Sequence, residues 1–351
     1  MVPRHGGIAF PQRSKMTDSN IVSREIRLAS RPTGMPTAAN FTMVRTELPR
    51  LEDQQVLVRN LYLSVDPYMR GRMNPGKSYV PPFEVGKALD GAAVGEVLES
   101  RAEDFKAGDA VTSFFGWRDC FVSSPKYLHP IDREVQSLSV YLGVLGMTGM
   151  TAWIGLNLVD VKAGDVIFVS GAAGAVGSVA GQLAKLRGCR VIGAAGCDEK
   201  VKLLRERFGF DSAFNYKAGP VRAQLEREAP EGIDVYFDNV GGEMLEAALW
   251  SLRTHSRIIA CGSISGYNDE SPRPGPSNLH NIVTKRLTIK GFIVSDWMQQ
   301  RAQFEHEVAP LFVAGKLKHE ETVVHGLEHA VDAFIGLFRG ENSGKMVVAL
   351  G

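Results

Sequence analysis

Three glycines in one short segment provide the clearest chemical signal in this sequence. Gly171, Gly174 and Gly177 follow an apolar run at residues 166–169, and an amphipathic pattern and a second apolar run at 191–195 follow them. A strand, a Gly-rich turn and a helix in this order cradle the pyrophosphate of a dinucleotide. Gly174 would let the backbone approach the phosphate, whose charge suits the N–H groups of the helix start. We therefore predict a dinucleotide site rather than a structural turn.

The end of the second apolar run indicates which dinucleotide this is. A site that prefers NAD carries Asp or Glu about 20 residues after the turn, where it bonds the ribose 2′-OH. In this chain Gly196 and Cys197 stand there, and Lys200 follows. Asp198 and Glu199 could be read as the missing acid, but we assign them to the start of the next helix, where carboxylates are favourable. A missing carboxylate and a nearby ammonium suit a 2′-phosphate, so we predict NADP(H).

Composition narrows the class of protein. The 351 residues suffice for one large or two ordinary domains, and 44% hydrophobic with 23% charged residues is typical of a soluble globular protein. A net charge of +1 argues against a nucleic-acid surface. The four cysteines lie far apart without a CxxC pair or clustered His, so we expect no zinc site, no disulfide framework and a cytoplasmic location.

Two segments could be mistaken for targeting or membrane signals. Residues 137–159 carry no charge, and their length could span a bilayer. They also hold Gly, Thr, Asn and Ser and lack flanking basic clusters, so we predict buried helices where two domains join and no membrane span. Residues 1–15 are basic and contain Pro and Gly but no apolar stretch. We expect a disordered extension there, which a choice of start site before Met16 could explain.

The pattern of the elements changes along the chain. Between about residues 25 and 130, short β-like runs such as 55–62, 91–98 and 108–112 alternate with Gly/Pro turns, which predicts a mostly antiparallel, barrel-like domain. From about residue 165, strands alternate with helices, which predicts a doubly wound parallel sheet of six strands and an α/β fold. The later strands are predicted at 213–215, 233–238, 257–262 and 287–294, with helices at 199–208 and 243–252.

The C-terminal part is predicted to return to the first domain. After Trp297 a helix at 302–315 and a strand at 345–350 remain. We therefore expect a substrate domain over 16–145, a dinucleotide-binding domain over 146–300, and residues 301–351 back in the substrate domain.

A β-rich lobe before a dinucleotide-binding lobe resembles the medium-chain dehydrogenase/reductase superfamily. The motifs look like its zinc-free leukotriene/prostaglandin reductase and alkenal double-bond reductase branch, from about residue 24 to the C-terminus. The matching stretches are residues 60–70, 147–152, 236–242, 261–268 and 340–345. Ala172 stands where the first glycine of G-x-G-x-x-G would be. The zinc-free quinone and alkenal reductases share this A-x-G-x-x-G form, so Ala172 favours the zinc-free branch of the superfamily. The resemblance implies a Rossmann sheet, a GroES-like domain and a homodimer.

The resemblance also implies a set of cofactor contacts. The pyrophosphate would lie at Gly174, Ala175, Val176 and Gly177, and the 2′-phosphate between Lys200 and Tyr216. The nicotinamide would lie against Cys261, Gly262, Ser263, Ile264, Ser265, Tyr267, Phe292, Ile293 and Val294. Asn239 would contact the cofactor from a strand end, and Asn342 from the returning tail. For Asn239 and Asn342 the alternative is plain turn formation, because Asn bonds its own backbone well.

The tyrosines are candidates for the chemistry itself. Zinc-dependent relatives polarise a carbonyl with a metal, but residues 66–70, where that site would start, hold no Cys or His. A phenol donates at neutral pH and can return a proton to a carbanion. We predict Tyr267 as the first catalytic residue and Tyr62 as the second, with Tyr62, Tyr68 and Tyr79 in the substrate pocket. The alternative for each is a core tyrosine with its hydroxyl at the edge.

The Pro/Gly-rich loop at 268–281 follows Tyr267 directly. Loops of this length are often functional, so it is either a lid over the substrate or a surface connection, and the resemblance favours a lid.

The predicted reaction is hydride transfer from NADPH to the β-carbon of an α,β-unsaturated carbonyl. Tyr267 or the ribose hydroxyl would stabilise the enolate, and protonation of the α-carbon would complete the reduction. Two alternatives remain open, a quinone reductase and an NADP(H)-binding redox sensor without turnover; a zinc alcohol dehydrogenase is disfavoured. The resemblance does not fix which enone, alkenal or quinone is bound.

Overall fold

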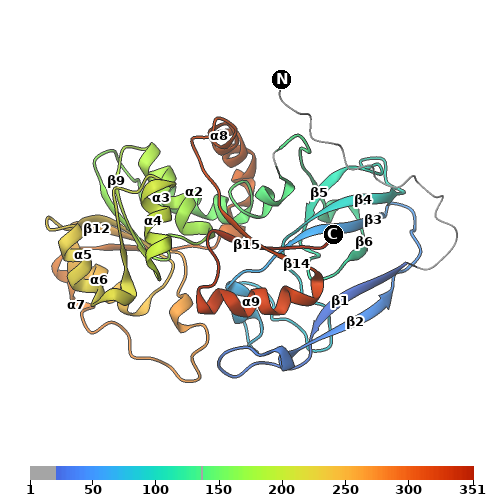
Figure 1. The fold of residues 1–351 in the computed structure, drawn as a ribbon, viewed down its shortest axis with the longest axis horizontal. Helices are drawn as coiled ribbons and strands as arrows, with labels where there is room; N and C mark the ends of the chain where they lie inside the picture. The colour runs from blue at the N-terminus through green and yellow to red at the C-terminus, as the bar shows by residue number, and fades with distance from the viewer. Residues whose placement is uncertain (1–20, 136) are drawn as a thin grey trace.

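Two lobes make up the molecule (Figure 1). The computed structural model describes residues 21–135 and 137–351. One lobe is built around a parallel sheet with helices on both faces, and the other around a larger, mostly antiparallel sheet. Residues 1–15, predicted to be an extension, lie outside the described part of the chain.

The parallel sheet has six strands in the order β10-β9-β8-β11-β12-β13. Strand β8 is central, and the chain builds outward first to one edge and then to the other. This order is that of a doubly wound sheet, as predicted. The strands are β8 (Val166–Val169), β9 (Arg190–Ala195), β10 (Ser212–Asn215), β11 (Ile233–Asp238), β12 (Leu252–Ala260) and β13 (Thr288–Gly291).

Helices cover both faces of this sheet because successive side chains of a buried strand point to opposite sides. In β8, Ile167 and Val169 pack in the same apolar cluster as α2 and α3, whereas Val166 and Phe168 pack with α5 and α6. The helices are α2 (Met147–Leu158), α3 (Ala175–Leu186), α4 (Asp198–Glu206), α5 (Val221–Glu228), α6 (Gly242–Ser251) and α7 (His280–Thr284).

The second sheet runs in the order β14-β15-β3-β4-β5-β7, with β6 also paired to β3. Its pairs are antiparallel except for β14 and β15. Its strands are β3 (Val56–Ser64), β4 (Ala93–Ser100), β5 (Ala110–Ser113), β6 (Cys120–Ser123), β7 (His129–Pro130), β14 (Glu321–His325) and β15 (Lys345–Ala349). The last strands of the chain therefore pair with one of the first. A separate antiparallel pair joins β1 (Val22–Leu28) to β2 (Phe41–Glu47).

The remaining helices accompany this lobe or its junction with the other. Figure 1 shows α8, α9 and β15 at the junction between the lobes. These helices are α1 (Tyr68–Arg72), α8 (Arg301–Val313) and α9 (Ala330–Arg339). The 3-10 turns are η1 (Ala38–Asn40), η2 (Pro125–Tyr127), η3 (Leu138–Leu142), η4 (Tyr216–Ala218), η5 (Ile264–Gly266), η6 (Val294–Gln300) and η7 (Leu327–His329).

The predicted α/β class is confirmed, and the differences lie in element bounds and in elements that were not predicted, among them α5, β14 and α9. The strand predicted over 287–294 ends at Gly291, because Phe292 and Val294 leave the sheet to pack against the cluster around α2. Helix α5 was not predicted, since few of its residues are apolar. No observation tests the predicted domain boundaries, which stay a prediction.

The uncharged segment 137–159 forms η3 and α2 and is largely buried. Helix α2 packs against the parallel sheet so closely that a Cβ at Gly155 would lie 2.8 Å from the Phe237 ring. On another side, Trp153 meets Phe304 of α8. Contact on several sides accounts for a helix with almost no polar face. Within residues 21–135 and 137–351, no helix is long and apolar enough to cross a membrane.

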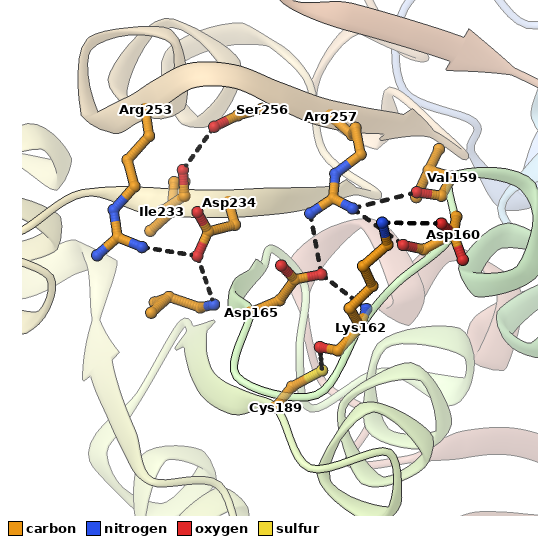
Figure 2. A network of polar contacts seen from close by, with 11 residues as sticks. Val159, Asp160, Lys162, Asp165, Cys189, Ile233, Asp234, Arg253, Ser256 and Arg257 are labelled. Carbon is orange, nitrogen blue, oxygen red and sulfur yellow. Dashed lines mark hydrogen bonds and ion pairs between the residues drawn. The ribbon is translucent and has the colours of Figure 1, made fainter.

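A network of hydrogen bonds and ion pairs stabilises the parallel sheet at the side where its strands begin (Figure 2). The Asp165 carboxylate accepts from the N–H of Lys162 at 2.8 Å and from Nη2 of Arg257 at 2.9 Å. Arg257 also donates to the Asp160 carbonyl just after α2. The Asp234 carboxylate accepts in the same way from Nη1 of Arg253, at 2.8 Å. These contacts join α2, β8 and β12 at the edge opposite the Gly-rich turn.

We predict that Asp165→Ala lowers the free energy of unfolding by about 2–4 kcal/mol, because it leaves the mostly buried Arg257 guanidinium without its counter-ion. Urea denaturation measures this. Lys162→Ala is the control, since its ammonium pairs with Asp160 in solvent and should change stability by less than about 0.5 kcal/mol. Equal effects of the two variants would contradict the prediction.

Candidate active site

The carboxyl ends of the parallel strands meet at one edge of the sheet, and most of the predicted site residues follow these ends. The Gly-rich turn leaves β8 at the point where the strand order reverses, between β9 and β11. Ligands of open α/β sheets bind at such a switch point. Lys200 follows β9, Asn239 follows β11, residues 261–267 follow β12, and residues 292–294 follow β13.

The turn itself is shaped to accept an anion. Gly171 has φ of +57°, which favours glycine, and Gly174 is the N-cap of α3 without a side-chain cap. A Cβ at Gly177 would clash with the Gly171 carbonyl and lie 2.8 Å from Cα of Ala172. The free N–H groups at the start of α3 carry a partial positive charge. The first turn of α3 holds no acidic residue that would offset this charge.

The predicted 2′-phosphate residues gather around the end of β9. A Cβ at Gly196 would lie 3.1 Å from Oη of Tyr216, so the phenol packs against the strand end. Lys200 donates to the Gly340 carbonyl at 2.7 Å, which brings the returning tail to the same place. Burial lowers the pKa of the Lys200 ammonium, the nearby Cys197 opposes this, and Lys217 adds a smaller lowering. The two cations thus lie close enough to repel, a charge pattern that an anion would relieve.

The carboxylates beside Lys200 belong to the helix, as predicted. Asp198 and Glu199 form the first turn of α4. A backbone N–H holds the pKa of Glu199 below its ordinary value. Asp198 accepts from the Asn215 side chain at 2.9 Å.

A buried network under the Asn239 turn was not predicted. The Asp238 carboxylate accepts from Oη of Tyr236 at 2.7 Å and from the N–H groups of Val240 and Gly241 at 2.9 and 2.8 Å. Burial raises the pKa of Asp238, and these hydrogen bonds oppose the rise. Its signal in the sequence is a polar residue directly at the end of a buried strand.

Asn239 is held by the neighbouring strand end. Its Nδ2 donates to the Ser170 carbonyl at 2.8 Å, and its own N–H donates to Oγ of Ser170 at 3.0 Å. The amide therefore joins β8 to β11, which differs from the turn within its own backbone that we considered. Asn342, by contrast, donates to the Gly344 carbonyl two residues on, at 2.8 Å, which fits turn formation.

The segment after β12 folds back over the strand end and places the Tyr267 phenol there. Oη of Tyr267 accepts from the N–H of Ser263 at 3.2 Å, and a Cβ at Gly262 would lie 3.3 Å from it. Burial raises the pKa of Tyr267, and the Ser263 hydrogen bond partly offsets this. The phenol is therefore protonated at neutral pH. Because its oxygen accepts from the backbone, its own proton can go to another acceptor.

Two of the predicted pocket tyrosines, Tyr68 and Tyr79, belong to the antiparallel lobe. Burial raises the pKa of Tyr79, and the nearby Tyr267 raises it further. Burial likewise raises the pKa of Tyr68, with smaller contributions from Asp66 and Tyr79. Tyr79 is 57% exposed and lies near both Tyr267 and Tyr68.

Tyr62 has a different environment. It packs in an apolar cluster with Val94, Leu142 and Val347, whereas its neighbour Leu63 belongs to the cluster against which Tyr68 packs. Adjacent residues of β3 point to opposite faces, so Tyr62 is not brought together with Tyr68 and Tyr267.

The other predicted nicotinamide contacts surround the same strand ends. Cys261, Phe292 and Val294 pack against the cluster around α2. Burial raises the pKa of the Cys261 thiol to about 12, so it carries no charge at neutral pH. Ser265 donates to the Val240 carbonyl at 2.7 Å, which ties η5 to the turn after β11.

The place where a metal site would start holds an ion pair. The buried Asp66 carboxylate lies 3.3 Å from Nζ of Lys345 and also contacts Oγ of Ser64. In the described part of the chain, no three His, Cys, Asp or Glu side chains come together as a metal site would require. A cavity of about 610 Å³ opens elsewhere on this lobe, beside Arg72, Phe83 and Arg118, and none of the predicted site residues lines it.

We predict that Gly177→Ala lowers the free energy of unfolding by about 1–3 kcal/mol, because its methyl group meets the backbone of the Gly-rich turn. Helix propensity alone would favour alanine, so the sign of the change is informative. Gly219→Ala is the control, since a Cβ there meets nothing within 4 Å. Urea denaturation of both variants tests this, and a stabilised Gly177→Ala would contradict it.

Family models match both halves of the chain. The N-terminal domain of an oxidoreductase family matches residues 24–131. A model described as zinc-binding dehydrogenase matches residues 175–313.

Characterised relatives cover nearly the whole chain. It is 43% identical to an NADP(+)-dependent 2-alkenal reductase of Nicotiana tabacum, over 93% of this chain and 97% of the relative. It is 40% identical to an NADPH-dependent curcumin reductase of Escherichia coli, over 92% and 95%. The crystal structure of CurA from Vibrio vulnificus in complex with NADPH superimposes with a TM-score of 0.89 at 40% identity, over 93% of this chain and 99% of that chain.

Proposed function

Because this chain belongs to the zinc-free medium-chain dehydrogenases/reductases, in the branch of the alkenal and prostaglandin reductases, we propose that it reduces the carbon–carbon double bond of α,β-unsaturated aldehydes and ketones with NADPH. The observation that carries the proposal is the protonated Tyr267 phenol at the carboxyl edge of the parallel sheet, whose oxygen accepts from the Ser263 N–H so that its proton is left for a substrate oxygen.

The residues at the sheet edge fit NADPH. Gly174 to Gly177 would hold the pyrophosphate at the start of α3, where a side chain at Gly177 has no room. Lys200 and Tyr216 would flank the 2′-phosphate. Asn239, residues 261–265, residues 292–294 and Asn342 would hold the nicotinamide half. When bound, NADPH supplies the hydride.

Tyr267 would act on the substrate carbonyl. As negative charge builds on the carbonyl oxygen, the phenol donates a hydrogen bond to it, and burial strengthens that bond because it lowers the local dielectric. The Ser263 N–H holds the phenol oxygen in place while it donates. Tyr68 and Tyr79 would wall the pocket. We keep a role for Tyr62 as a weaker proposal, because its apolar cluster lies on the other face of β3.

Quinone reduction is the second candidate, since a quinone is a vinylogous enone and would use the same phenol. A redox sensor without turnover is the third, but it requires the loss of a site residue, and Gly174, Lys200, Asn239 and Tyr267 are all present. We also propose a homodimer from the family resemblance. The exposed edge strand β13 could pair with a second copy.

A substrate panel separates these candidates. NADPH consumption is measured with an alkenal, with a quinone and without either, and repeated with NADH. We expect turnover with the alkenal and at least about tenfold preference for NADPH, since the 2′-phosphate is bound by an ammonium. Lys200→Ala should reduce that preference. No consumption above background with any acceptor would refute the enzyme proposals and favour the sensor.

We predict that Tyr267→Phe lowers kcat on an enone about 10- to 1,000-fold, because the variant loses one hydrogen-bond donor to the developing oxyanion. The dissociation constant for NADPH should stay within about twofold. Stopped-flow turnover and fluorescence titration measure the two quantities. An unchanged kcat would remove Tyr267 from the mechanism.

A further inference from the structure

We propose that Arg70 is a positioning residue: its buried guanidinium holds Asn268 across the two lobes and thereby fixes Tyr267 in the site. The effect on turnover rests on the function proposed above. The contact itself stands on the structure alone and is tested separately.

Arg70 is buried in an unusual way. It is only 2% exposed, in the five-residue helix α1. Its nitrogens donate to the carbonyls of Gly34 and Pro32 at 2.9 and 3.3 Å and to Oδ1 of Asn74 at 2.6 Å. Within residues 21–135 and 137–351 it forms no ion pair, so its charge is met by neutral oxygens alone. A buried charge without a counter-ion is costly, which suggests a role beyond packing.

One partner of Arg70 comes from the other lobe. Its Nε–H is shared between Oδ1 of Asn268 at 3.1 Å, 198 residues further along the chain, and the Gly34 carbonyl at 3.2 Å. Nδ2 of Asn268 in turn contacts Sδ of Met35 at 3.4 Å. The Asn268 amide thus bridges the guanidinium and the loop that the guanidinium also holds.

The same two segments also meet at Gly34 and Glu270. Gly34 has φ of +68°, and a Cβ there would lie 2.6 Å from Oε1 of Glu270. The loop at residues 32–35 therefore lies directly under residues 268–270. The Arg70 bond is part of a packed interface and not an isolated contact of two long side chains.

The position of Tyr267 depends on this interface. Tyr267 is held on one side by the 3.2 Å hydrogen bond from Ser263 and by the single 3-10 turn η5, which is a weak support. On its other side the next residue is Asn268. Arg70 lies two residues after Tyr68 in α1, so its guanidinium joins the helix that carries Tyr68 to the residue after Tyr267. Misplacing a reacting group by about 1 Å can cost about 100-fold in rate.

Asn268→Ala tests the contact, because it removes the acceptor from a half-buried loop residue and leaves the buried Arg70 in place. We expect kcat/KM for an enone to fall about tenfold, mainly through kcat, with the NADPH dissociation constant within about twofold. Asn268→Asp should restore kcat/KM to within about threefold, since a carboxylate accepts well from a guanidinium. Arg273→Ala, which removes the Asp269–Arg273 ion pair of the same loop, is the control and should change kcat/KM less than twofold.

A double-mutant cycle assigns the effect to Arg70. Arg70→Met combined with Asn268→Ala should be no slower than Arg70→Met alone, because both variants remove one interaction. If Arg70→Met does not fold, the Asn268→Ala and Asn268→Asp pair decides. Equal loss in Asn268→Ala and Asn268→Asp, or additive losses in the cycle, would overturn the proposal.

Hydrogen exchange separates this proposal from the proposed function. Without any substrate, amides of residues 264–270 should exchange at least about fivefold faster in Asn268→Ala than in the wild type, and unchanged in Arg273→Ala. A wild type that is inactive on every acceptor refutes the function and leaves this test intact. Unchanged exchange in Asn268→Ala refutes the positioning role even in an active enzyme.

Discussion

The arrangement of the two lobes depends on the junction at Gly344 and Lys345, one half of which is the buried ammonium of Lys345. It donates to the Val65 carbonyl at 3.0 Å and pairs with Asp66, which fixes the end of β3 to β15. One residue earlier, the Gly344 N–H donates to the Ala173 carbonyl of the Gly-rich turn at 2.7 Å. Gly344 and Lys345 therefore contact both the Gly-rich turn before α3 and the turn before α1. Breaking a buried pair leaves an uncompensated charge, so this junction resists change.

The candidate site follows from this junction because each lobe supplies one half of it. The parallel sheet presents its strand ends, which suit a dinucleotide, and the turn after β3 leads into α1 with Tyr68 and Arg70. Tyr267 belongs to the first lobe, but its neighbour Asn268 is held by the second. A change in the distance between the lobes would therefore move the Tyr267 phenol relative to Tyr68, even if each lobe kept its own structure.

Local patterns made the dinucleotide half predictable, whereas the substrate half depends on contacts between distant residues. The Gly-rich turn lies within one strand–turn–helix unit, so spacing reveals it. The Lys345–Val65 contact joins residues 280 apart, and no periodicity in the sequence marks it. Tyr62 and Tyr68 lie in one motif, yet β3 ends at Ser64 and places them on different sides. The lining of the pocket could not be read from the motif for that reason.

Burial limits the chemistry that this site can perform. It raises the pKa of the Tyr267 phenol and of the Cys261 thiol, so both side chains nearest the end of β12 are neutral at pH 7. A neutral thiol is a poor nucleophile, and a neutral phenol is a donor and not a base. Covalent catalysis and proton abstraction by these groups are therefore disfavoured. A neutral phenol that donates stabilises a substrate that becomes negative during the reaction, as an enone does when it accepts a hydride.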